Sequence, residues 1–185
     1  MSQILSYKSL TPQVAKTAFV APNATLTGDV KVGECSSIWF NAVIRGDIQR
    51  VEIGKYTNIQ DNVSVHVTAD EPTIIGDYVA IGHNAVVHCS KIGNNCLIGM
   101  GATVLDGAVI GRGSIVGAGA LVTKGTIIPP NSLVVGCPAK VKKTLDENGF
   151  KAIHAQAVKY KSEWAEKYGL GLEVGGEVYD GSKIV

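Results

Sequence analysis

The sequence predicts an all-β protein, a parallel β-helix of about seven triangular coils with a C-terminal α-helix packed alongside. Two observations lead to this fold class. An aliphatic residue returns at every sixth position over most of the chain, and near the C-terminus the apolar spacing changes to that of a helix. The composition agrees, because valine and isoleucine favour strands, while 22 glycines and only 6% aromatic residues suit short strands joined by tight corners.

The six-residue recurrence identifies a repeat architecture, which fits neither the helical period of 3.6 nor the two-residue alternation of an ordinary strand. We call its aliphatic positions the beat residues. They are Val14, Val20, Leu26, Val32, Ile38, Ile44, Ile53, Ile59, Val65, Ile75, Ile81, Val87, Ile92, Ile98, Val104, Ile110, Val116, Val122, Ile128 and Val134.

Three hexads make one coil of eighteen residues, with a short strand on each side of a triangle. The beat residue would point into a shared core, and the small residues that often stand two places before it would leave room near the corner. Successive coils would stack at strand spacing, roughly 4.8 Å. Each coil buries its apolar side only against its neighbours, so many coils are needed. We assign residues 1–140 to this β-helix.

After Pro138 the recurrence stops and a helical pattern follows. Apolar residues at helical spacing predict an amphipathic helix over 141–169 that ends at Gly169. They are Ile153, Ala157, Tyr160, Trp164 and Tyr168. Residues 170–185 show no period, and we expect an irregular, mobile tail.

The bulk properties exclude several classes of function. A net charge of +1 gives no broad field that would attract nucleic acid or an anionic membrane. No apolar run has membrane-spanning length, and the first residues lack the pattern of a signal peptide, so we expect a cytoplasmic protein. The four cysteines form no CxxC pair, which favours reduced, packed thiols.

Insertions in the recurrence place three polar residues in one column of the coils. Arg45, His66 and His88 each follow a beat residue directly, and the gaps between them are 21 and 22 residues. Each gap is one coil of eighteen plus an insertion of three or four residues, which would form a surface loop. Asp61 and His83 are also 22 apart and would stack in the same way on the preceding side.

Two histidines one coil apart can share a metal ion, since zinc–nitrogen bonds of about 2.0–2.1 Å fit between side chains of adjacent strands. His83 lies around a corner and would point away from the other two within one chain. A homotrimer could bring His83 of one subunit to His66 and His88 of the next. The alternative is that all three are surface or hydrogen-bonded histidines, as we expect for His154 in the helix.

The segment IRGDIQRVEIGKYTNIQDNVSVH resembles the signature of gamma-class carbonic anhydrases, members of the hexapeptide-repeat superfamily of left-handed β-helices. In that family an Arg-Gly-Asp stretch precedes Asn-x-Gln-Asp and the first metal histidine, here residues 45–47, 58–61 and His66. The later GHNAVVH matches the remaining ligand pair, His83 and His88. The resemblance implies a left-handed coil and a homotrimer with the metal between subunits.

The resemblance also implies a chemistry. Three histidines with one open position would let Zn²⁺, or alternatively Fe²⁺ or Co²⁺, lower the pKa of a bound water to about 7. The hydroxide would hydrate carbon dioxide to bicarbonate. Gln60 would orient that hydroxide, and Arg45 with Asp47 or Asp61 would form an ionic network across the subunit boundary. Tyr160 would either reach this pocket or anchor the helix on the β-helix.

The best-studied enzymes of this class carry an acidic loop and glutamates that serve proton transfer, and this sequence departs from them. Here Ile48 follows Asp47, and the loop after His66 is only VTADEPT, with Asp70 and Glu71. We therefore expect proton export to be slow or to take another route.

Two other functions fit the same repeat. One is an acyl-CoA-dependent acyltransferase, which typically uses a single histidine as general base between subunits and does not need three in register. The other is a catalytically weak trimeric assembly protein that retains the metal.

Overall fold

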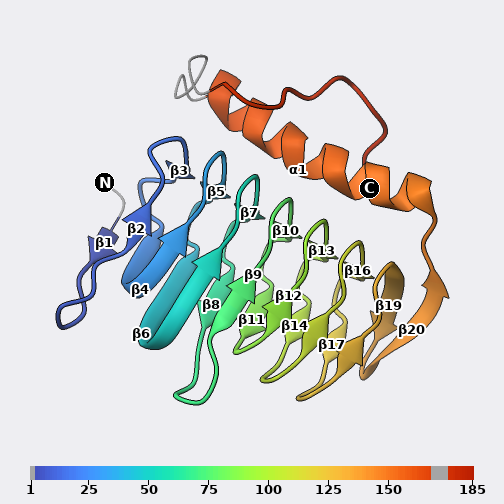
Figure 1. Ribbon diagram of the computed structural model, residues 1–185, viewed down its shortest axis with the longest axis horizontal. Coiled ribbons are helices and arrows are strands. Elements are labelled where there is room, and N and C mark those ends of the chain that lie inside the picture. The colour runs from blue at the N-terminus through green and yellow to red at the C-terminus, as the bar shows by residue number, and fades with distance from the viewer. Residues whose placement is uncertain (1–2, 168–174) are drawn as a thin grey trace.

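The computed structural model describes residues 3–167 and 175–185, and it is a left-handed parallel β-solenoid of about seven turns with one helix alongside. Figure 1 shows the coils following one another along the long axis while α1 lies over one side of them. The predicted fold class is therefore confirmed.

Two of the three faces of the solenoid form a single 12-stranded sheet, because β4 (Thr25–Val32) and β6 (Val43–Ile53) run around the corner between them. On the first face, the first halves of β4 and β6 are joined by β1 (Gln3–Leu5), β8 (Ser64–His66), β11 (Val86–His88), β14 (Thr103–Val104) and β17 (Leu121–Val122). On the second face, their second halves are joined by β2 (Gln13–Val14), β9 (Thr73–Ile75), β12 (Lys91–Ile92), β15 (Val109–Ile110) and β18 (Ile127–Ile128).

The third face is an eight-stranded sheet. Its strands are β3 (Phe19–Val20), β5 (Ser37–Ile38), β7 (Asn58–Ile59), β10 (Ala80–Ile81), β13 (Leu97–Ile98), β16 (Ile115–Val116), β19 (Ser132–Gly136) and β20 (Ala139–Thr144). Its strands pair in parallel except for β19 with β20, which is antiparallel.

The beat residues form the core. All of them from Leu26 onward are buried, and each pairs in register with its equivalent one coil away, as Ile59 does with Ile81. The small residues beside the corners, such as Ala42 and Ala85, are also fully buried. Full burial of one such aliphatic side chain stabilises the fold by roughly 1.5–3 kcal/mol, so the stacked columns supply most of the favourable energy.

The chain between the solenoid and the helix differs from the prediction. The expected helix covers 141–169, but Ala139–Thr144 forms β20 and α1 spans Glu147–Lys167. β20 folds back on β19 and pairs backbone groups that the end of the third face would otherwise expose.

The helix then begins at a side-chain cap. Asp146 accepts a hydrogen bond from the backbone N–H of Gly149 at 3.0 Å, which satisfies one of the unpaired donors of the first turn. The expected terminus at Gly169 lies outside the described residues, as do Tyr168 and the side chain of Trp164.

The apolar side of α1 packs on the third face, against β5, β7 and β10. Ile153 and Ala157 are buried there, as the helical spacing predicts. Tyr160 packs edge-to-face against Trp39, with ring centroids 5.6 Å apart and an angle of 85° between the rings. The helix is therefore fixed on the strands that precede the candidate site residues. In the described part of the chain, no helix combines the length and the apolar character needed to cross a membrane.

The C-terminal segment, residues 175–185, has no helix or strand, as predicted, but it is fastened to the protein. The Glu177 carboxylate accepts a hydrogen bond from the Tyr78 hydroxyl, and its other oxygen lies 2.8 Å from His154 Nε2. The rings of Tyr56, Tyr78 and His154 stack on one another. These contacts correct the expectation of a loose tail, and they give His154 the structural role that we expect for it.

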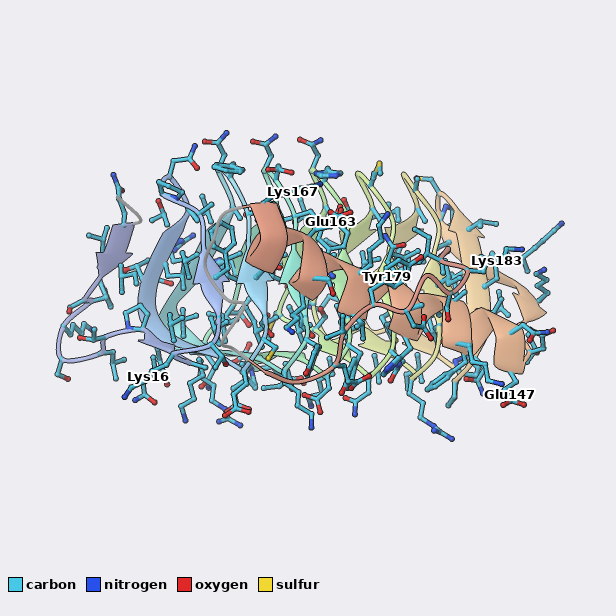
Figure 2. All side chains as sticks on the ribbon, turned by 90° about the horizontal axis from the view of Figure 1, so that it is seen from above. Lys16, Glu147, Glu163, Lys167, Tyr179 and Lys183 are labelled. Carbon is cyan, nitrogen blue, oxygen red and sulfur yellow. The ribbon has the colours of Figure 1, made fainter. Side chains whose placement is uncertain are left out.

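A second contact holds the segment along the helix. The Tyr179 N–H donates to Ser162 Oγ at 3.1 Å, and Figure 2 shows Tyr179 lying against α1. Residues 170–174, the first part of the predicted tail, lie outside the described residues.

The beat residues should dominate stability. We expect Ile81→Ala, which empties a fully buried position, to lower the free energy of unfolding by about 2–5 kcal/mol. The matched change Ile127→Ala, at a side chain that is 74% exposed, should cost less than about 0.5 kcal/mol. Urea unfolding of both variants measures the difference, and equal losses would contradict the core assignment.

Attachment of the C-terminal segment should depend on the Glu177 charge. Partial burial raises the pKa of this carboxyl, but the hydrogen bonds from Tyr78 and His154 outweigh it and hold the pKa below its ordinary value of 4.5. The bound anion therefore contributes stability above pH 4.5 that is lost as the pH falls through the lower folded pKa.

We accordingly expect Glu177→Gln to release the segment at neutral pH, so that a carboxypeptidase removes the last residues several-fold faster. Asp180→Asn is the control, because the hydrogen bond of this carboxylate lies within the segment, where it accepts from the Ser182 N–H at 2.9 Å. Equal digestion of wild type and Glu177→Gln would refute this role.

Candidate metal centre

The first face brings His66 and His88 together as the column alignment predicts. The two residues are direct partners in the parallel pairing of β8 with β11. Arg45 belongs to the same column, since Val43 pairs with Ser64 and Ile44 with Val65 in the residues just before it. The imidazoles of His66 and His88 are 18% and 29% exposed, so both are partly shielded yet open to one side.

Each of these histidines has a carboxylate on one ring nitrogen. His66 Nε2 lies 3.0 Å from Asp47 Oδ1, and His88 Nδ1 bonds to Asp106. For Asp47, burial raises the pKa, but hydrogen bonds from Arg45 and His66 outweigh it and hold the pKa below its usual range. For Asp106, the hydrogen bond from His88 lowers the pKa against the opposing effect of burial. Both carboxyls are therefore ionised at neutral pH.

The two remaining ring nitrogens face each other. His66 Nδ1 lies 3.2 Å from His88 Nε2. An ionised carboxylate only accepts hydrogen bonds, so the one hydrogen of each neutral imidazole is on the nitrogen next to its aspartate. When both rings are neutral, each facing nitrogen presents a lone pair, and a cation between the two nitrogens would accept both lone pairs.

This donor set fits a divalent metal ion. Two nitrogens bound to one tetrahedral zinc ion at about 2.0–2.1 Å lie about 3.3 Å apart, close to the 3.2 Å between His66 Nδ1 and His88 Nε2. A carboxylate on the far nitrogen of a ligand histidine is also the usual support of such ligands. The pair could supply two of the ligands of one ion.

Local backbone geometry explains how Arg45 and Asp47 reach this column. β4 and β6 approach so closely at their shared corner that a Cβ on Gly46 would lie 2.4 Å from the Asp29 carbonyl oxygen. Glycine is therefore required between the two charged residues. Arg45 then reaches across it and donates to Asp47 Oδ2 at 2.6 Å.

His83 lies elsewhere, at the corner between the third and first faces. Its Nδ1 is 2.8 Å from Asp61 Oδ2, and the two residues stack one coil apart as predicted. Among residues 3–167 and 175–185, no three His, Cys, Asp or Glu side chains gather into a group that could hold a metal. His66 and His88 thus converge within the chain, and His83 does not join them. Asp61 pairs with His83, whereas Arg45 pairs with Asp47.

Gln60 and Tyr160 line one cavity of about 280 Å³, together with Gly82, Met100 and Val185. Gln60 is 3% exposed, and its Nε2 donates to Asn58 Oδ1 at 3.0 Å, which fixes the carboxamide. Burial raises the pKa of Tyr160 to about 12, so its hydroxyl stays protonated at neutral pH. Tyr160 also packs on Trp39, as an anchor of the helix on the β-helix does.

Sequence reasoning missed Asp106. Its signal is the eighteen-residue interval from His88, which is one coil. It is hidden because this coil is one residue short, so that His88 follows its beat residue by one place and Asp106 follows Val104 by two.

Comparisons with known proteins place the chain in a family. A family model described as bacterial transferase hexapeptide (six repeats) matches residues 89–124. A protein of Methanocaldococcus jannaschii named "Probable carbonic anhydrase" is 54% identical over 157 residues, covering 84% of this chain and 99% of the relative. Gamma carbonic anhydrase 2, mitochondrial, of Arabidopsis thaliana is 42% identical over 155 residues, covering 80% of this chain and 56% of the relative.

This chain belongs to the gamma-class carbonic anhydrase-like family. Within the hexapeptide-repeat fold, a hexapeptide transferase family protein from Anaplasma phagocytophilum has a solved structure with a TM-score of 0.84. It is 40% identical, with 87% of this chain and 95% of that chain covered. Relatives of this gamma-class chain thus include proteins named as transferases, and the repeat alone does not distinguish the two activities.

The hydrogen bond to Asp47 should fix the tautomer of His66. We expect ¹⁵N-histidine spectra of the metal-free protein at neutral pH to show His66 protonated on Nε2, because that nitrogen donates to the carboxylate. In Asp47→Ala the preference should be lost. A His66 protonated on Nδ1 in the wild type would contradict this reading of the pair.

Proposed function

We propose that this chain is a metal-dependent carbonic anhydrase that hydrates carbon dioxide to bicarbonate at a zinc site between the subunits of a homotrimer. The observation that carries the proposal is the pair of facing ring nitrogens of His66 and His88, 3.2 Å apart, each imidazole being bonded to its own aspartate. The name of the Methanocaldococcus jannaschii relative, whose length is covered almost completely, supports the same activity.

The position of His83 supports a shared site. It lies around a corner from the other two histidines, with its Nδ1 already held by Asp61 and its Nε2 left for a ligand. The first face also presents apolar side chains beside the histidine pair, since Val43 is 42% and Val86 37% exposed. A neighbouring subunit that brings its third-face corner against this face would bury those side chains and supply the third imidazole.

The residues around the site have separable tasks. His66 and His88 of one chain and His83 of a neighbouring chain would hold a divalent metal ion, which would lower the pKa of a bound water to about 7 and so provide hydroxide at neutral pH. Gln60, fixed by Asn58, orients the attacking oxygen through its carboxamide. The cavity beside Gln60 is largely apolar, which suits an uncharged substrate such as carbon dioxide. Arg45 neutralises the charge of Asp47 and keeps it turned toward His66.

The proposal is tested with purified protein, measuring metal content, mass in solution and carbon dioxide hydration together. We expect about one zinc ion per chain, a mass three times 19.4 kDa, and hydratase activity. His66→Ala should lose metal and activity, because it removes one of three ligands. Gln60→Ala should keep both metal and trimer but lower turnover on the order of 10²-fold, as loss of one orienting hydrogen-bond donor does.

His154→Ala is the matched control, since this histidine lies in the C-terminal cluster and should leave metal content unchanged. A wild-type protein that contains no metal, or one that is inert toward carbon dioxide but transfers acetyl groups from acetyl-CoA, would overturn the proposal.

A further inference from the structure

We propose that Asp106 is a positioning residue that holds His88 in the orientation and tautomer required for metal binding, an inference that rests on the proposed metal site. Asp106 bonds to His88 Nδ1. That contact leaves Nε2 as the ring nitrogen that can bind a metal ion. Nε2 is also the nitrogen that faces His66 at 3.2 Å. Asp106 thus determines which nitrogen of His88 meets the metal.

The backbone around Asp106 is fixed from both sides. It follows β14 in the coil after His88, and its carbonyl accepts from the Gly125 N–H of the next coil at 2.8 Å. The N–H of Gly107 donates back to the Cys89 carbonyl at 2.7 Å, next to His88 itself. The carboxylate is therefore presented from a rigid corner, which is what precise support of a ligand needs.

Asp106 is not placed to be a ligand. It contacts the far nitrogen of the His88 ring, whereas the proposed ion lies on the side of Nε2. Without the aspartate, the ring could turn over or move its hydrogen to Nε2, and either change would remove the lone pair from the site. Loss of such a supporting carboxylate typically costs 10–100-fold in metal affinity.

A purely structural role in the corner is the competing explanation, and the chain offers a matched control for it. Asp77 occupies the same place in its hexad, two residues after the beat residue Ile75. Its carboxylate also supports a corner, accepting from the Lys55 N–H at 2.9 Å, and within residues 3–167 and 175–185 it forms no hydrogen bond with a histidine. Asn94 stands at the equivalent place one coil later, so the corner accepts an asparagine.

The experiment is a Co²⁺ titration of metal-free full-length protein. Absorption spectra are recorded for every variant, and the mass of the assembled protein in solution is checked. We expect Asp106→Asn to weaken Co²⁺ binding 10–100-fold and to alter the ligand-field bands, while Asp77→Asn matches the wild type. Asp106→Glu should recover part of the affinity, because it restores an anionic acceptor.

Co²⁺ affinity of Asp106→Asn within twofold of the wild type, with unchanged bands, would overturn the role of Asp106 and leave the proposed function standing. A wild type that binds no Co²⁺ and no Zn²⁺ would overturn both. If the Asp106 variants do not fold, the zinc-loaded wild type decides, because ¹⁵N spectra must then show His88 protonated on Nδ1. A hydrogen on Nε2 would refute the inference.

Discussion

The parallel register between successive coils is the constraint on which the rest of the structure depends. Most strands are only a few residues long, and the strands obtain their hydrogen bonds and buried contacts from the coils before and after them. Side chains therefore stack on their equivalents, and a slip of one residue would turn the aliphatic column outward. The same register that stacks Ile44 on Val65 also stacks His66 on His88. Core and site are consequences of one alignment.

This register places charge as well as apolar surface. Asp47, Asp61 and Asp106 each hold one nitrogen of a different histidine, and all three do so between coils that the backbone has already aligned. In a neutral imidazole, such an arrangement directs the lone pair of the opposite nitrogen away from the aspartate. In His66 and His88 the nitrogens opposite the aspartates face each other at 3.2 Å, which is the separation that two ligands of one metal ion need. Aspartates in these positions are the usual support of histidines that bind a metal ion.

The same stacking of coils explains which parts of the fold and of the candidate site the sequence can predict. The solenoid and the His66–His88 column could be predicted, because a fixed period and counted insertions determine which residues stack. Asp106 could not be found by that counting, since its coil is one residue short. The start of α1 was misplaced because β20 is stabilised by pairing with β19, which no local pattern displays. The contacts of Glu177 could not be predicted either, because the hydrogen bond from Tyr78 joins residues almost a hundred positions apart.

In the proposed trimer, metal binding and subunit assembly depend on each other, because the three histidine ligands are divided between different faces of the solenoid. One chain offers a preformed pair on its first face and a single imidazole, held by Asp61, around the corner. Neither part is a complete site, so each subunit gains the full coordination energy only when a neighbour is present, and metal binding stabilises the assembled state by mass action. A rigid solenoid suits this task, because it can hold His83 and the His66–His88 pair at fixed positions on different faces without a flexible loop between them.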